Sequence, residues 1–191
     1  MDCDVYGPSI PLMMGVRGRP TIEGESLVPV ENLGIKTMSM GLLVDENTPV
    51  VWRGPMVNKT IQQFAQNVNW GNLDVLVVDL PPGTGDAYLT VMKDINIDDF
   101  ILVTSNNKLA ISDSLKTLTM AEKFNINVFG YIENHMITNS KPNDENIFNL
   151  IKINYLGSVN FDSKIYNFDT NYVPDDIIAL SEKILSTINK I

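Results

Sequence analysis

Cysteine and histidine are nearly absent from this chain of 191 residues, which contains one of each, Cys3 and His135. A single cysteine can form neither an internal disulfide nor a CxxC metal site. A lone histidine likewise cannot build a metal site, so we interpret His135 as structural or exposed. We interpret Cys3 as a small inert residue, because the acidic side chains beside it would raise the pKa of its thiol.

Basic residues and long apolar runs are also scarce. The chain has 14 Lys and Arg against 23 Asp and Glu, a formal net charge of −9. Because affinity for nucleic-acid phosphates needs clustered Lys and Arg, we expect no nucleic-acid partner. No apolar stretch approaches the roughly 18 residues that span a membrane, and the N-terminus lacks the basic and apolar regions of a secretory signal. We therefore expect no membrane association and a cytoplasmic location.

The apolar pattern predicts the α/β class, with a mostly parallel sheet and helices on both faces. Short apolar runs predict strands at 74–80, 100–104 and 126–132, and we expect the first to be buried on both faces. Helical spacing of apolar residues predicts helices over 57–68, over 111–121 and after Pro174. A small antiparallel insertion is predicted within 26–51, with arms at 35–44 and 48–52, and a loop leading to a short helix at 138–150.

Ligands of open parallel sheets bind at the carboxyl ends of strands, and Asp79 ends the first predicted strand. A carboxylate there could hold Mg²⁺ as a Walker B acid does. The glycines that follow, in Pro81-Pro-Gly-Thr-Gly85, let backbone N–H groups approach a phosphate closely. The alternative is that Asp79 only caps the following helix.

Two segments imitate a phosphate-binding loop without being one. Pro81-Pro-Gly-Thr-Gly85 continues with Asp86, and a carboxylate in place of the usual lysine would repel a phosphate. Gly54-Pro-Met-Val-Asn-Lys-Thr60 lacks the glycine before its lysine, and Pro55 removes a backbone donor. No G-x-x-x-x-G-K-[ST] motif exists in the chain.

Two further groups of side chains could carry chemistry. Asp2 and Asp4 point the same way if the backbone is extended, and they could then serve a metal ion or orient a water. The alternative is a frayed acidic terminus. Asn134 follows the third apolar run and could read an adenine edge through its paired donor and acceptor.

Taken together, these segments resemble the Mrp family of MinD-like deviant P-loop ATPases. Asp2-Cys-Asp-Val-Tyr-Gly-Pro-Ser-Ile-Pro11 is similar to the family's switch I, and Val51-Trp-Arg-Gly-Pro-Met-Val57 to its W-R-G-P-M motif. Trp70-Gly-Asn-Leu-Asp74, continuing through Asp79 to Asp86, is similar to switch II. Glu133-Asn134 with Met136 resembles E-N-M, and Leu156-Gly-Ser158 with Asp162 resembles L-G-x-I-P-x-D. The resemblance covers nearly the whole chain.

The resemblance implies a role for each matched residue. Asp4 would be catalytic and orient the water that attacks the γ-phosphate of ATP. Asp79, with Asp2, would hold Mg²⁺ through water. The nucleotide would be contacted by Gly83, through its backbone, by Thr84 and, at adenine, by Asn134. The family's members are thought to be homodimers that carry or load iron–sulfur clusters, so iron–sulfur client or scaffold proteins are the expected partners.

The chain departs from the family in two respects. The family's first strand, P-loop and first helix precede switch I, and we expect residues 1–191 to be one nucleotide-binding domain without that segment. The family also places a CxxC soon after E-N-M, whereas residues 134–145 contain no cysteine, which puts cluster binding in doubt. Three interpretations stay open: an ATPase assisting iron–sulfur maturation, a MinD-like ATP switch without a cluster, or an inactive truncated or split-gene fragment. We expect this chain alone to be inactive.

Overall fold

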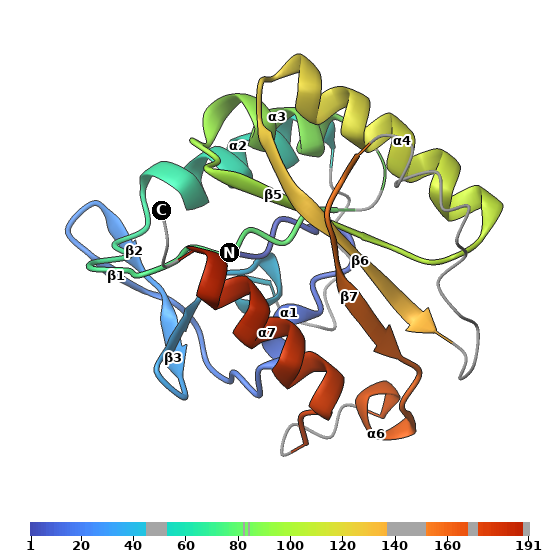
Figure 1. Ribbon diagram of the computed structural model, residues 1–191. Coiled ribbons are helices and arrows are strands. Elements are labelled where there is room, and N and C mark those ends of the chain that lie inside the picture. Colours follow the sequence, from blue (N-terminus) through green and yellow to red (C-terminus); the bar gives the residue numbers. More distant parts are fainter. Residues whose placement is uncertain (45–52, 82, 84, 137–151, 168–171, 189–191) are drawn as a thin grey trace. The chain divides into compact units, whose positions relative to one another are not determined.

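The computed structural model describes residues 1–44, 53–81, 83, 85–136, 152–167 and 172–188 (Figure 1). The chain forms two compact units, residues 1–96 and residues 97–191. Each unit is described by itself.

Two short antiparallel hairpins form the middle of the first unit. Strand β1 (Thr21–Glu23) pairs with β2 (Ser26–Val28), and β3 (Val30–Asn32) pairs with β4 (Ile35–Thr37). The predicted antiparallel character is confirmed, but the predicted arm over 35–44 is wrong in length. It ends at Thr37 because the Ser39 hydroxyl caps the 3-10 helix η1 (Met40–Leu42). The second predicted arm, 48–52, lies outside the described residues.

Helices α2 (Gly54–Gln66) and α3 (Asp86–Asp94) contact each other in the first unit. The prediction of α2 is confirmed, since Val57, Ile61 and Phe64 recur at helical spacing and are buried. The sequence pattern did not predict α3, whose nine residues are too few to show a clear period. A third helix, α1 (Ile10–Met13), is a single turn that follows the acidic N-terminal segment.

The segment 74–80 is extended but is not the doubly buried strand that its apolar run predicted. Val75, Leu76 and Val77 are 50%, 38% and 73% exposed. An apolar run becomes a buried strand only where other elements cover it. In the described part of residues 1–96, its backbone forms an isolated parallel bridge between Asp2 and Asp79, and the Val77 carbonyl oxygen accepts a hydrogen bond from the Met1 amino group.

A three-stranded parallel sheet organises the second unit, in the order β5–β6–β7. Its strands are β5 (Asp99–Thr104), β6 (Asn127–Met136) and β7 (Tyr155–Asn160). The predictions of strands at 100–104 and 126–132 are confirmed, as is the parallel arrangement. Gly130 of β6 must be a glycine, because a Cβ there would lie 2.6 Å from the Asn154 carbonyl oxygen.

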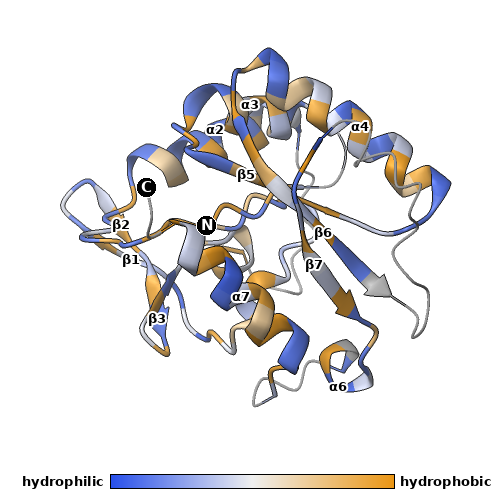
Figure 2. Ribbon diagram, in the orientation of Figure 1, coloured by the Kyte–Doolittle hydropathy of each residue, from blue (hydrophilic) through white to orange (hydrophobic). Residues whose placement is uncertain are grey.

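Helices α4 (Lys108–Lys123) and α7 (Asp175–Ile188) lie on opposite sides of this sheet (Figure 1). Both confirm predicted helices, and apolar and polar residues mix along each of them (Figure 2). Helix α4 contacts β5 and β6, whereas α7 contacts β7. A short helix, α6 (Ser163–Tyr166), follows β7. The predicted loop and helix at 138–150 lie outside the described residues. None of the described helices is long and apolar enough to cross a membrane.

Candidate functional site

Two parallel extended segments of the first unit bring Asp2 beside Asp79. The Cys3 N–H donates to the Asp79 carbonyl oxygen over 2.9 Å, and the Asp79 N–H donates to the Met1 carbonyl oxygen over 2.9 Å. The chain direction is the same in both segments. The two carboxylates, which are 77 residues apart in the sequence, therefore reach the same end of the paired segments.

Asp2 is buried, with 1% of its surface exposed. Its Oδ2 accepts a hydrogen bond from the Ser39 hydroxyl over 2.7 Å, and its Oδ1 accepts one from the Asp4 N–H over 3.1 Å. Burial raises the pKa of the Asp2 carboxyl, and these two hydrogen bonds, together with one from the backbone of Ile10, oppose that rise. Asp2 is thus an ordered part of the protein interior and not a frayed terminus.

Asp79 is an exposed residue whose carboxyl group still loses part of its hydration against the protein. This desolvation raises the pKa of Asp79, and the negative charges of Asp2 and Asp4 raise it further. A cation bound at Asp79 would relieve that repulsion.

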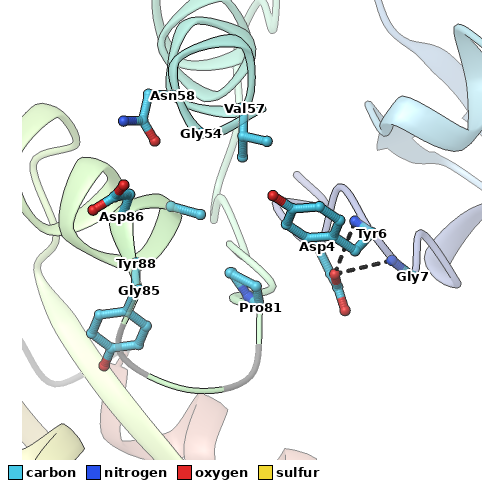
Figure 3. Close-up of a pocket in the computed structure, with 11 residues that line it drawn as sticks. Asp4, Tyr6, Gly7, Gly54, Val57, Asn58, Pro81, Gly85, Asp86 and Tyr88 are labelled. Atoms are coloured by element: carbon cyan, nitrogen blue, oxygen red, sulfur yellow. Dashed lines mark hydrogen bonds between the residues drawn. The ribbon is translucent and has the colours of Figure 1, made fainter. Parts of the chain in front are cut away.

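Asp4 adopts a turn that orients its carboxylate. Its Oδ1 accepts hydrogen bonds from the N–H groups of Tyr6, over 3.2 Å, and Gly7, over 3.1 Å, both drawn in Figure 3. A Cβ at Gly7 would lie 3.3 Å from the Asp4 Oδ2, so the turn is tight against the carboxylate. Backbone donors of this kind fix the direction in which an Asp side chain points.

A cavity of about 500 Å³ opens beside Asp4 and lies between the N-termini of α2 and α3 (Figure 3). A Cβ at Gly54 of α2 would lie 3.4 Å from the Asp86 Oδ2 of α3, which shows how closely the two helix ends approach. The described lining residues include two carboxylates and no Lys or Arg. They are Asp4, Tyr6, Gly7, Gly54, Val57, Asn58, Pro81, Gly85, Asp86, Ala87 and Tyr88.

The glycines after Asp79 leave the backbone open, as the sequence predicted. Gly83 is exposed and has a φ of +88°, a conformation that favours glycine, and a Cβ there would meet nothing within 4 Å. Gly85 is the N-cap residue of α3. Thr84 lies outside the described residues.

Asn134 lies near the end of β6, in the second unit, and is half-buried. Its neighbour Glu133 is buried and pairs in register with Thr104 of β5 and Ser158 of β7. Asn134 therefore sits at the carboxyl end of a parallel sheet, where ligands of such sheets bind. Its contact with adenine remains a prediction.

A family model for the NUBPL iron-transfer P-loop NTPases of the ParA type matches residues 1–174. The chain belongs to this family. Membership confirms the resemblance described above and agrees with the α/β class of the fold.

Curated relatives of this NUBPL-type chain include proteins from bacteria and eukaryotes. It is 48% identical over 134 residues to the iron-sulfur cluster carrier protein of Bacillus subtilis (strain 168), which covers 70% of the chain and 38% of the relative. It is 42% identical over 135 residues to the iron-sulfur protein required for NADH dehydrogenase of Arabidopsis thaliana mitochondria, covering 70% and 43%. The matched part of the chain thus spans about two fifths of the length of these relatives.

Solved structures show the same fold. A nucleotide-binding protein from Archaeoglobus fulgidus, in complex with ADP, is 31% identical and has a TM-score of 0.74, covering 92% of this chain and 76% of its own. The cell division ATPase MinD of Pyrococcus furiosus is 14% identical, with a TM-score of 0.69 over 97% of this chain and 84% of its own. The second likeness concerns the fold alone.

The described residues of the NUBPL-type chain suit a magnesium ion better than they suit the phosphates of a nucleotide. No group of three or more His, Cys, Asp or Glu close enough to hold a metal occurs among the described residues. Mg²⁺ nevertheless often keeps several waters and uses one or two carboxylates together with substrate phosphates. Asp79 suits that mode, since it is an exposed carboxylate beside a second one, Asp2. The described lining of the cavity supplies no cationic side chain for phosphate.

Two polar residues at this site were missed by the sequence analysis, Ser39 and Asn58. The Ser39 hydroxyl bonds Asp2 across 37 residues of sequence. Asn58 lines the cavity, and its Oδ1 is buried without a hydrogen-bond partner in the described chain. Neither residue belongs to a motif with a known chemistry at fixed spacing, so no local signal pointed to it.

Proposed function

We propose that this chain carries the switch segments of an ATP hydrolase that assists iron–sulfur cluster assembly or transfer. The observation that carries the proposal is the parallel pairing of residues 1–3 with 77–79, which brings Asp2 beside Asp79, while the Asp4 N–H donates to the Asp2 carboxylate. The names of the curated relatives support an iron–sulfur cluster as the group that the whole protein carries.

Asp79 is the residue that we propose to hold Mg²⁺ through water. It is the exposed member of the carboxylate group, and its pKa is raised first by desolvation and then by the negative charges of Asp2 and Asp4, whose repulsion a divalent cation would offset. Asp2, whose two oxygens both accept hydrogen bonds, would support the site from the interior. When bound, Mg²⁺ and ATP supply the phosphoryl group and the neutralisation of its charge.

Asp4 is the residue that we propose to orient the attacking water. Its Oδ1 is held by the N–H groups of Tyr6 and Gly7, and it lines the cavity (Figure 3). A carboxylate fixed by two backbone donors needs no reorganisation before it accepts a proton from water. Gly83 and Thr84 would contact the phosphates, and Asn134 the adenine.

The experiment is an ATPase assay on a longer protein, in which a segment with a phosphate-binding loop of the form G-K-G-G-x-G-K-[ST] is joined to the N-terminus of this chain. Asp79→Ala should abolish Mg²⁺-dependent hydrolysis, because metal positioning is lost. Asp4→Ala should preserve nucleotide binding and slow turnover by about 100-fold or more, the usual contribution of a general base. The control is Asp113→Ala, which removes an exposed acid of α4 that pairs with Lys116. Wild-type turnover in the Asp4→Ala protein would remove Asp4 from the mechanism.

A second candidate function is a MinD-like ATP switch that binds no cluster. The absence of a CxxC from the sequence favours it. Both candidates predict the same ATPase behaviour of Asp4 and Asp79, and they differ in whether the protein holds a cluster. We further propose a homodimer, one nucleotide-binding domain over residues 1–191, and iron–sulfur client or scaffold proteins as partners.

A further inference from the structure

Ser39 is fully buried, with 0% of the residue exposed, and its hydroxyl contacts the buried carboxylate of Asp2. We propose that Ser39 is a positioning residue that orients Asp4 by holding the carboxylate of Asp2. The inference deepens the proposed function, because it concerns how the Asp4 side chain is placed for the reaction.

The hydrogen bonds of Ser39 have a defined direction. Its Oγ accepts the N–H of Gly41 over 3.1 Å and lies 2.7 Å from the Asp2 Oδ2. A backbone N–H can only donate, and a serine hydroxyl carries a single proton. The Ser39 proton is therefore directed at the Asp2 carboxylate, where it forms a short, charge-assisted hydrogen bond.

The second carboxylate oxygen of Asp2 binds the backbone of Asp4. The Asp2 Oδ1 accepts the Asp4 N–H over 3.1 Å. The main chain of Asp2 is held as well, because its N–H donates to the Met38 carbonyl oxygen over 2.9 Å. The carboxylate of Asp2 thus has one oxygen on Ser39 and the other on the backbone of Asp4.

The 3-10 helix η1, which Ser39 caps, also lies close to the segment that follows Asp4. A Cβ at Gly41 would lie 3.3 Å from the Pro8 Cβ and 3.4 Å from the Pro8 carbonyl oxygen. Ser39 and Gly41 therefore lie close to the acidic segment both before Asp4, at Asp2, and after it, at Pro8.

The experiment is amide hydrogen exchange, measured by NMR on the full chain. Ser39→Ala should lower the protection of the Asp4 amide about five-fold relative to that of Phe64 in α2, since one hydrogen-bonded link is lost. Ser39→Thr retains the hydroxyl and should restore the protection at Asp4, even though its extra methyl group lowers the overall stability. In an Asp2→Ala background, which removes both acceptor oxygens, Ser39→Ala should add no further loss at Asp4, because the relay is already broken.

Ser114→Ala is the matched control. Ser114 is also buried, and its hydroxyl bonds Thr104 over 2.8 Å in the second unit. It should leave the Asp4 amide unchanged. If Ser39→Ala does not fold, Ser39→Cys, whose thiol is somewhat larger and a weaker donor, should give a smaller loss of the same kind.

Three outcomes would overturn the positioning role: unchanged protection of Asp4 in the Ser39→Ala protein, an equal loss at Asp4 and Phe64, or an undiminished loss in the Asp2→Ala background. The second outcome would identify Ser39 as a structural residue only. The proposed ATPase function is tested by a different measurement, the turnover of the Asp4→Ala protein. A negative result for Ser39 in hydrogen exchange therefore does not contradict the ATPase function, and the reverse also holds.

Discussion

At the scale of single residues, Cys3 is the one side chain that could ligate a cluster through sulfur, and its surroundings oppose this. It is fully buried, with 0% of its surface exposed. Burial raises the pKa of the Cys3 thiol to about 12. The thiolate, which is the form that ligates metals, is therefore strongly disfavoured at neutral pH.

We predict that the chain forms no stable iron–sulfur cluster through cysteine. One thiolate from each chain would give two in a dimer, whereas stable clusters usually take four. The measurement is anaerobic reconstitution with iron and sulfide, followed by absorbance spectroscopy, and the expected spectrum shows no cluster bands. Cluster bands that the Cys3→Ser substitution abolishes would contradict the prediction, whereas bands that survive it would identify ligands other than cysteine.

At the scale of elements, the start of the short helix α6 depends on Asp162. This N-cap residue accepts the Lys164 N–H over 2.7 Å and the Tyr172 hydroxyl over 2.9 Å. The two hydrogen bonds lower the pKa of Asp162 from its ordinary value of 3.8. Tyr172 lies before α7, so this one carboxylate joins the segments that lead into both helices.

The stabilisation by ionised Asp162 should depend on pH. The folded-state pKa of Asp162 lies below 3.8. The stabilisation is therefore fully present at a pH above 3.8 and is lost as the pH falls through the folded-state pKa. Asp162→Ala should therefore lower the unfolding temperature at pH 7 and cost less at a pH below 3. Asp162→Asn, which keeps an acceptor oxygen but cannot ionise, serves as the control. Thermal unfolding followed by circular dichroism measures both, and a larger cost of Asp162→Ala in acid would contradict this account.

At the scale of the whole molecule, the distribution of charge opposes nucleotide binding by the chain as given. ATP carries about four negative charges, which P-loop proteins meet with a lysine and the N–H groups at a helix N-terminus. Here Asp4 and Asp86 line the cavity, and none of its described lining residues is Lys or Arg. Unit charges about 4 Å apart repel by several kcal/mol at an effective dielectric near 20, and one Mg²⁺ cannot neutralise both carboxylates and nucleotide.

We predict that this chain binds ATP weakly or not at all. The few backbone donors near Gly83 and Gly85 would contribute about 1 kcal/mol each, which falls far short of micromolar affinity. Isothermal titration with ATP and Mg²⁺ measures this directly. Binding at about 10 μM or tighter would mean that other residues hold the phosphates, with Lys59 the first to test.

The sequence by itself determined the features that are encoded within short windows. The strands β5 and β6 and the helices α2, α4 and α7 follow from apolar periodicity, because the side that faces a core must be apolar at the period of the element. The family also followed from the sequence, since its motifs are local runs such as Asp79–Asp86. The candidate residues Asp4 and Asp79 were chosen on the same basis.

Only the tertiary structure decided how distant segments meet. The run at 74–80 had the composition of a buried strand, yet Val77 is exposed, because burial depends on which other elements cover a segment. Ser39 carries no motif, and its role arises from a hydrogen bond to a residue 37 positions away. The orientation of Asp4 likewise depends on which donors reach Asp2. Contacts of this kind depend on the packing of the whole unit, which no short window of sequence contains.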